Sequence, residues 1–185
     1  MSIKKNTDEI NNCLYILRQG GLILYPTDTI WGIGCDATNM EAVDKIYKIK
    51  QRSDSKALIS LVADKKQLEI YTSIQTELID SNIPTTVIYP KVIGLAKNLL
   101  ANDNSAAIRV TKDEFCKKLI KKFKKAIVST SANISGQNHP ERFSDINPLI
   151  LNKVDYIVNL RQQETMKKPS TILRIIQNGE IQKIR

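Results

Sequence analysis

The residues of this 185-residue chain that could do chemistry are cationic and hydroxyl side chains on segments predicted to be loops. Arginine provides paired planar donors, lysine provides a point charge, and serine and threonine provide neutral hydroxyl donors. Together these groups are typical of a site that binds an anionic ligand. The set comprises Thr27, Asp28, Thr29, Lys50, Arg52, Lys56, Ser105, Arg109, Ser129, Ser131, Asn133 and Ser170.

Other classes of site are disfavoured by patterns that the sequence lacks. It contains no GxxxxGK[ST] motif, and the GIGCDA stretch at Gly32–Ala37 carries only part of the dinucleotide-binding pattern GxGxxG. The single histidine, His139, is not preceded by a GxSxG motif, which disfavours a Ser-His-Asp hydrolase. No spacing of carboxylates, histidines or cysteines indicates a metal site. Cys13, Cys35 and Cys116 are interpreted as small core residues in a reducing compartment.

The composition, 42% hydrophobic and 25% charged, is that of a globular protein. The formal net charge of +9 favours anionic partners such as nucleotides, RNA or acidic proteins, although a compositional bias toward lysine explains it equally well. No window approaches the roughly 18 apolar residues of a membrane span, and the N-terminal MSIKKNTDEINN stretch lacks the apolar core of a signal peptide. We therefore expect a cytoplasmic protein with no membrane association.

Local patterns predict helices and strands that alternate along the chain. Thr7 can cap a helix that runs to Gln19, Thr38 or Asn39 can start a second, and the capping box at 111–114 starts another. Shorter helices are expected at 64–71 and 76–80. Strands are expected at 22–25, 57–62, 85–89, 106–110, 126–130, 154–159, 170–176 and 181–184, the last two joined by a hairpin turn at Asn178-Gly179.

This alternation, with a hairpin near the C-terminal end, predicts an α/β fold whose sheet is mixed rather than purely parallel. Neither an internal repeat nor a linker is evident, so residues 1–185 are expected to form one domain. In such folds, functional groups gather at the ends of strands and in the loops that follow them.

Five segments, in order and with similar spacing, resemble the YrdC/TsaC family of threonylcarbamoyl-AMP synthases. They read YPTDTIWGIGCDA, KIKQRSDSKALISLVAD, AIRV, VSTSANISG and PSTILRI, and they extend over essentially the whole chain. The length resembles that of the short, single-domain bacterial form. The resemblance implies the YrdC-like fold, an open and strongly twisted mixed sheet with flanking helices around a concave basic surface.

The resemblance also implies an activity, the first step of the t6A modification of tRNA at adenosine 37. The threonine amine and bicarbonate give a carbamate, whose oxygen attacks the α-phosphate of ATP and releases pyrophosphate. L-threonine, bicarbonate and ATP with Mg²⁺ are the implied substrates, no tightly bound cofactor is implied, and partner proteins transfer the threonylcarbamoyl group to tRNA. One alternative is a non-catalytic paralogue of the same fold that binds RNA or the ribosome. Another is carbamoyl transfer to a different acceptor.

By the same resemblance, each half of the site has its own residues. Lys50, Arg52 and Lys56 are the implied catalytic cations: Arg52 and Lys56 meet the ATP phosphates, and Lys50 supports them. Threonine is expected at Thr29, Arg109, Ser129 and Ser170, where Arg109 clamps its carboxylate. No residue is assigned to a metal. ATP is further expected to contact Ser105, Ser131, Asn133, His139 and Arg185, His139 by its backbone.

Several assignments have a plainer alternative. Lys50 and Arg52 also fit charge compensation at a helix C-terminus, and Arg109 also fits a surface salt bridge. Trp31 fits either the wall of the ligand site, beside glycines that admit the ligand, or core packing. The hydroxyls of VSTSANISG also fit a strand-to-loop turn. The lysines between 117 and 125 are more typical of a solvated helix face than of a surface that binds RNA or a partner protein.

The chain departs from the family pattern in several places. The PGPxT segment reads Pro84-Thr85-Thr86-Val87-Ile88, without the glycine, the second proline and the threonine hydroxyl, so substrate access at this loop is in question. Asp28 stands where glutamate is usual, and Ala57 stands where proline or glycine is usual. The chain ends on Arg185 without the usual glycine, and terminal residues fray easily.

Overall fold

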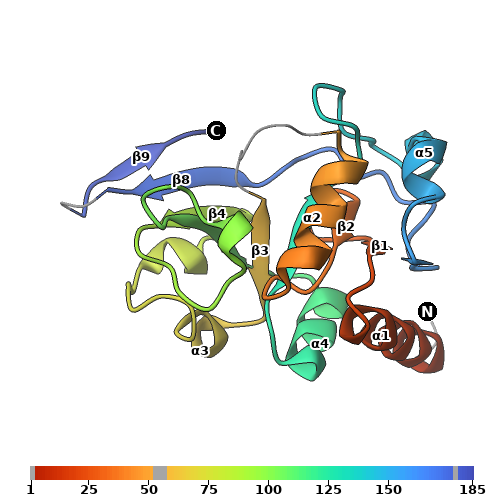
Figure 1. Ribbon diagram of the computed structural model, residues 1–185, viewed down its shortest axis with the longest axis horizontal. Helices are drawn as coiled ribbons and strands as arrows, with labels where there is room; N and C mark the ends of the chain where they lie inside the picture. Colours follow the sequence, from red (N-terminus) through yellow and green to blue (C-terminus); the bar gives the residue numbers. More distant parts are fainter. Residues whose placement is uncertain (1–2, 52–57, 177–178) are drawn as a thin grey trace.

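The computed structural model describes residues 3–51, 58–176 and 179–185. Within these ranges nine strands form one open, twisted sheet in the order β7-β1-β2-β6-β3-β5-β4-β8-β9 (Figure 1). The pairs β1/β7, β3/β5 and β4/β8 are parallel and the other neighbours are antiparallel, which confirms the predicted mixed sheet. The strands are β1 Ile23–Tyr25, β2 Gly32–Gly34, β3 Ile59–Val62, β4 Thr85–Tyr89, β5 Ala106–Val110, β6 Ile127–Ser131, β7 Tyr156–Ile157, β8 Thr171–Ile175 and β9 Ile181–Lys183.

Strand β2 is an element that the sequence did not predict. Its three residues include two glycines, which have low intrinsic strand preference, so the segment looks like a turn. It is a strand because it pairs with β1 on one side and with β6 on the other. The strands predicted at 85–89 and 106–110, by contrast, are confirmed residue for residue.

Two of the longer helices begin after a side chain that accepts a hydrogen bond from a free backbone amide. Asn39 caps α2 (Met40–Ile49) by accepting from the Ala42 amide at 3.1 Å, as predicted. Asp113 caps α4 (Glu114–Phe123) by accepting from the Cys116 amide at 2.8 Å. The remaining helices are α1 Ile3–Arg18, α3 Lys65–Leu68, α5 Pro148–Leu151 and the 3₁₀ turns Glu77–Asp80, Lys97–Leu99 and Phe143–Asp145.

Two predicted helix starts are wrong. Helix α1 begins at Ile3, so Thr7 lies inside it rather than at its cap. The cap of α4 is Asp113 rather than Thr111, because the Thr111 hydroxyl accepts from the Asp113 amide and leaves the helix amides to the Asp113 carboxylate. At α4 two neighbouring residues, Thr111 and Asp113, have side chains able to cap a helix, and only the hydrogen bonds of the folded chain separate them.

Two hydrophobic clusters pack against the sheet. Helices α1 and α4 lie side by side at the lower edge of Figure 1 and contribute to one cluster, whereas α2 contributes to the other. Cys13, Cys35 and Cys116 are fully buried in these clusters and form no disulfide, which confirms that they are core residues. Burial raises the pKa of each thiol, so all three are poor nucleophiles.

None of the helices in the described ranges has both the length and the apolar character needed to cross a membrane.

Gly34 allows β1, β2 and β6 to approach one another closely. A Cβ atom at this position would lie 2.6 Å from Tyr25 Cε1 and 2.6 Å from the Val128 carbonyl oxygen. Tyr25 is itself fixed, because its hydroxyl donates to that same carbonyl oxygen at 3.1 Å. Gly34 therefore serves the packing of strands, not the approach of a ligand.

We expect Gly34→Ala to destabilise the protein by about 3 kcal/mol, because the added methyl group displaces either an aromatic ring or a strand backbone. Gly136→Ala is the control: φ there is +85° but nothing lies within 4 Å of the added Cβ. We expect Gly136→Ala to destabilise the protein by about 1 kcal/mol, the cost of placing alanine in a left-handed backbone conformation. Urea unfolding measures both, and equal losses would contradict the close approach at Gly34.

Candidate active site

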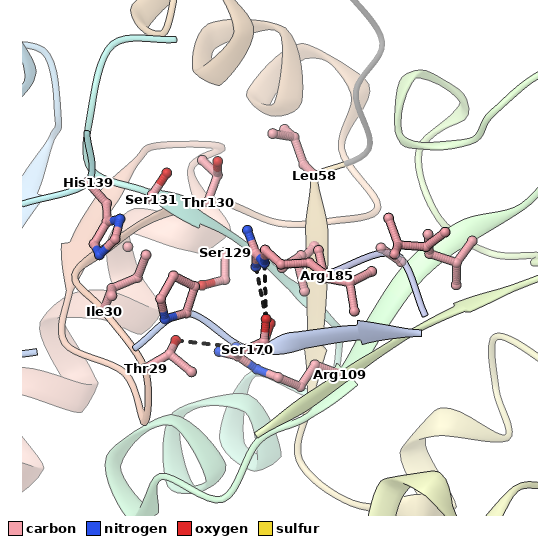
Figure 2. A pocket seen from close by; sticks show the side chains of 17 residues that line it. Thr29, Ile30, Leu58, Arg109, Ser129, Thr130, Ser131, His139, Ser170 and Arg185 are labelled. Atoms are coloured by element: carbon pink, nitrogen blue, oxygen red, sulfur yellow. Dashed lines mark hydrogen bonds between the residues drawn. The ribbon is translucent and has the colours of Figure 1, made fainter. Parts of the chain in front are cut away.

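A cavity of about 440 Å³ opens on one face of the sheet, between β5, β4 and β8 on one side and the 27–30 turn with β6 on the other (Figure 2). Its volume lies in the range of small-molecule sites. Strand alternation places alternate residues of β5 and β8 on this face. The lining residues are Thr29, Ile30, Gly32, Leu58, Ile59, Ile88, Ala107, Arg109, Ser129, Thr130, Ser131, His139, Pro169, Ser170, Ile172, Ile184 and Arg185.

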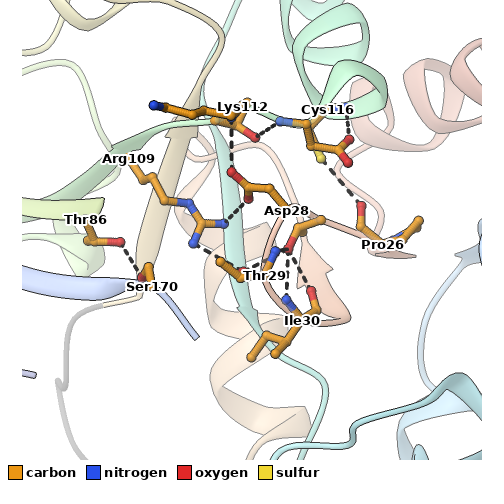
Figure 3. Close-up of polar contacts among 12 residues, drawn as sticks. Pro26, Asp28, Thr29, Ile30, Thr86, Arg109, Lys112, Cys116 and Ser170 are labelled. Atoms are coloured by element: carbon orange, nitrogen blue, oxygen red, sulfur yellow. Dashed lines mark hydrogen bonds and ion pairs between the residues drawn. The ribbon is translucent and has the colours of Figure 1, made fainter. Parts of the chain in front are cut away.

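Arg109 lies in the wall of this cavity and is only 3% exposed. Its Nη2 forms an ion pair with Asp28 Oδ1 at 3.1 Å, and its Nη1 donates to Thr29 Oγ1 at 3.3 Å (Figure 3). Asp28 also accepts a hydrogen bond from the Lys112 amide at 3.1 Å. Arg109 is thus not the surface salt bridge that the sequence left open: it is a buried, oriented guanidinium. Its Nε has no hydrogen-bond partner among the described residues.

The turn that carries Asp28 and Thr29 is organised by a single hydroxyl. Thr27 is 1% exposed, and its Oγ1 accepts from the amides of Thr29 and Ile30 at 3.1 and 3.2 Å. The same hydroxyl donates to the Ile30 carbonyl oxygen at 2.7 Å. These bonds fix the backbone next to Thr29, so the Thr29 hydroxyl has a defined position at the cavity wall.

Arg185, two residues after β9, brings a second guanidinium to the cavity. Its Nε and Nη2 donate to the Ser170 carbonyl oxygen at 3.2 and 3.0 Å, and its own amide donates to the Ile172 carbonyl oxygen at 3.2 Å. Burial and then the charge of Arg109 lower the pKa of Arg185. Two like charges that face one cavity repel each other, and an anion bound between them relieves that repulsion.

The loop after β6 is held by Lys50 from behind the cavity. Lys50 is 2% exposed, and its Nζ donates to the carbonyl oxygens of Ser131 and Asn133 at 2.6 and 2.7 Å. The Asn133 side-chain amide donates to the Gln137 carbonyl oxygen at 2.6 Å and so closes the loop on itself. Lys50 and Asn133 therefore shape the wall that carries Ser131, and neither lines the cavity.

The structure brings together seven of the residues predicted for the site. Thr29, Arg109, Ser129, Ser131, His139, Ser170 and Arg185 all line the one cavity. Lys50, Ser105 and Asn133 do not line it. Arg52 and Lys56 lie outside the described residues.

Three of the predicted residues have partners that define their surroundings. The Ser105 amide donates to Asp103 Oδ1 at 3.0 Å, and its hydroxyl accepts from Arg174 at 3.4 Å. His139 Nε2 lies 3.2 Å from the Lys167 carbonyl oxygen. Trp31 is fully buried with its ring centroid 5.1 Å from that of Phe143, so it is a core residue and not a wall of the cavity.

Some residues that line or support the cavity were not predicted from the sequence. The apolar residues Ile30, Ile172 and Ile184 carry no chemical signal that separates them from core residues, so only the fold reveals them. The 84–88 segment departs from the family pattern, yet it brings a threonine hydroxyl to the site. Thr86 is fully buried, and its Oγ1 lies 2.8 Å from Ser170 Oγ.

The arrangement can bind a carboxylate at the Arg109 fork and a second anionic group near Arg185, with hydroxyl donors between them. Among the described residues no group of three or more His, Cys, Asp or Glu side chains converges on a point. The guanidinium groups of Arg109 and Arg185 bring positive charge to the lining of this cavity.

We expect Lys50→Met to destabilise the protein by about 2–4 kcal/mol, because it leaves two carbonyl oxygens without a charged donor. This loss corresponds to a fall in melting temperature of roughly 5–10 °C for a domain of this size. Lys48→Met, at an exposed position in the last turn of α2, just before Lys50, is the matched control and should change little. Thermal unfolding followed by circular dichroism measures both; an unchanged Lys50→Met midpoint would show that this ammonium does not hold the loop.

Known proteins resemble the chain over most of its length. Residues 15–185 match the model of the Sua5/YciO/YrdC family, which is described as a telomere recombination family. The threonylcarbamoyl-AMP synthase of Psychromonas ingrahamii is 38% identical over 135 residues, which cover 69% of this chain and 71% of that protein. The synthase of Pseudoalteromonas translucida is 34% identical over 173 residues, which cover 89% of this chain and 91% of that protein.

Among solved structures, Sua5 of P. abyssi complexed with L-threonine matches with a TM-score of 0.83 at 24% identity. The match covers 95% of this chain but 53% of that one, so this chain spans about half the length of that structure. At this identity the likeness establishes the fold, which is the YrdC-like one. On the family model and the two sequence relatives together, the chain belongs to the Sua5/YciO/YrdC family.

Proposed function

We propose that this protein is an ATP-dependent threonylcarbamoyl-AMP synthase, which makes threonylcarbamoyl-AMP and pyrophosphate from L-threonine, bicarbonate and ATP. One observation carries the proposal: Arg109 is buried in the cavity wall, held by Asp28 and Thr29, with its Nε unpartnered among the described residues. A guanidinium held in this way suits a bidentate carboxylate. The two sequence relatives carry the name of this enzyme.

Threonine fits the half of the cavity around Arg109. Its carboxylate would meet the Arg109 guanidinium, and the hydroxyls of Thr29, Ser129 and Ser170 would surround its polar atoms. These four residues come from the 27–30 turn, β5, β6 and the position just before β8, and they line the same cavity. A site with several oriented hydroxyls discriminates against amino acids that lack a matching polar group.

ATP fits the half around Arg185, Ser131 and His139, with Arg52 and Lys56 as further cations for its phosphates. Mg²⁺ would enter with ATP as part of the substrate, because nucleoside triphosphates carry it. Ser105 and Asn133 would act from outside the lining, and Lys50 would act by holding the loop that carries Ser131.

The reaction would proceed without a covalent bond to the protein. The amine of threonine bonds to the carbon of bicarbonate, a C–O bond of bicarbonate breaks and water leaves, which gives a carbamate. One of the carbamate oxygens then attacks the α-phosphorus of ATP. The new P–O bond forms as the bond from the α-phosphorus to the β-phosphate bridging oxygen breaks, and pyrophosphate leaves. Catalysis of this kind depends on positioning and on cations that meet the developing charge.

Further parts of the proposal concern the cellular setting. The product would pass to proteins that transfer the threonylcarbamoyl group to adenosine 37 of tRNA, in the cytoplasm. The lysines of α4 and of the residues after it would form the surface that binds RNA. Three of them, Lys117, Lys121 and Lys125, already pair with carboxylates. Residues 1–185 would act as one domain, a proposal that the continuous sheet supports.

The test is pyrophosphate release from ATP by the purified protein, with threonine and bicarbonate each present or omitted. We expect release only when both are present. Pyrophosphate release that is the same with and without threonine would contradict the proposal. A folded protein that releases no pyrophosphate under any condition would favour a non-catalytic RNA-binding role.

In the same assay we expect Arg109→Lys to raise the KM for threonine roughly 50-fold, because lysine keeps the charge but loses the fork, and hydrogen bonds to charged groups are worth about 1.5–3 kcal/mol. The KM for ATP should change far less. Arg18→Lys, at an exposed position on α1, is the matched control. Equal threonine KM values for Arg109→Lys and Arg18→Lys would place the carboxylate elsewhere.

A further inference from the structure

A pair of buried hydroxyls lies below the cavity, between β4 and the residue that precedes β8. Thr86 is fully buried and Ser170 is 2% exposed. Their Oγ atoms are 2.8 Å apart, and the side chains point toward each other (Figure 3). Ser170 lines the cavity, whereas Thr86 does not. The hydroxyl of Thr86 therefore reaches the cavity only through Ser170.

The position of Thr86 in the sheet does not itself require a hydroxyl, so the hydroxyl is the feature of this residue that needs an explanation. Strands β4 and β8 are parallel, with Thr86 opposite Ile172, and both Ile172 and Ile88 line the cavity. A valine has nearly the same shape as threonine and is equally suited to a buried strand. A buried hydroxyl is unfavourable unless it is hydrogen-bonded. The Thr86 hydroxyl is satisfied here by Ser170, one of the side chains that face the proposed threonine subsite.

Ser170 joins three parts of the site. Its hydroxyl is hydrogen-bonded to the Thr86 hydroxyl, and its carbonyl oxygen accepts from Nε and Nη2 of Arg185. Its side chain lies near Thr29 and Arg109 in the cavity (Figure 2). A serine side chain has three staggered χ1 positions, and a hydroxyl also rotates about its C–O bond. The bond to Thr86 selects one of these arrangements.

We propose that Thr86 is a positioning residue for the amino-acid half of the site: it fixes the Ser170 hydroxyl in the orientation that threonine meets. This inference rests on the proposed function. A hydroxyl has one proton and two acceptor lone pairs, so Ser170 keeps bonding capacity for the ligand whichever of the two oxygens donates. Without the Thr86 hydroxyl, the Ser170 hydroxyl would have to be ordered when threonine binds. The binding free energy would be reduced by the cost of that ordering.

Three substitutions of Thr86 separate its hydroxyl from its methyl group. Thr86→Val removes the hydroxyl and keeps the shape. Thr86→Ser and Thr86→Ala both remove the methyl group, and only Ser keeps the hydroxyl, so the difference between them isolates the hydroxyl even if Val disturbs folding. Thr85→Val is the matched control on the same strand: the Thr85 hydroxyl donates to the Ile83 carbonyl oxygen, away from the cavity.

The measurement is the KM for threonine and the KM for ATP in the pyrophosphate-release assay, with melting temperatures recorded beside them. We expect Thr86→Val and Thr86→Ala to raise the threonine KM roughly fivefold to tenfold, the value of one hydrogen bond, and to leave the ATP KM unchanged. Thr86→Ser and Thr85→Val should match the wild-type protein in both constants.

Two results would overturn this inference while leaving the proposed function in place. One is an active wild-type enzyme whose threonine KM is unchanged in Thr86→Val and Thr86→Ala. The other is an equal effect of Thr86→Ser and Thr86→Ala on both constants, which would make Thr86 a packing residue only. A wild-type protein that shows no threonine-dependent release would remove the proposed function, and this inference with it.

Discussion

The site depends on a buried ion pair between Asp28 and Arg109. The Arg109 side chain is 3% exposed and the Asp28 side chain 12% exposed, and removing two charges from water costs several kcal/mol per ion before their attraction offsets it. Such a pair is weak evidence for stability, so its presence needs a functional reason. The pair holds the guanidinium toward Thr29 and the cavity, while the Lys112 amide holds Asp28 in turn. A bound carboxylate then meets a donor that is already oriented, and it spends little free energy on ordering it.

The sheet explains how such distant residues converge. Asp28 follows β1, and Arg109 lies on β5. The strands between β1 and β5 fix the separation of the two backbones, which the side chains of Asp28 and Arg109 span. Hydrophobic clusters pack this frame and keep it rigid. The C-terminal strands close the other side, where Ser170 anchors Arg185. A second cation thus faces the first across a cavity lined by hydroxyls, which suits a reaction between an amino acid and a nucleotide.

Much of this could be predicted from the sequence, and the failures have physical causes. Strand β4 is rich in β-branched residues, and β5 is an apolar run interrupted only by Arg109, so pattern alone located them. Strand β2 is mostly glycine and owes its conformation to neighbouring strands, which no local pattern reports. The anion-binding set was recognised by residue type. Sequence could not show that Lys50 points at backbone carbonyls, that Trp31 lies in the core, or that Thr86 contacts Ser170, because these are contacts across the fold.

The decisive measurement is whether ligand binding requires a carboxylate at Arg109. Calorimetry would compare L-threonine with L-threoninol, which has an alcohol in place of the carboxylate, on the wild-type protein. We expect measurable binding of threonine and a loss of roughly 2 kcal/mol or more in binding free energy for threoninol, because threoninol offers the Arg109 guanidinium no carboxylate. Equal affinity for the two ligands would show that the Asp28–Arg109 pair serves the fold rather than the substrate.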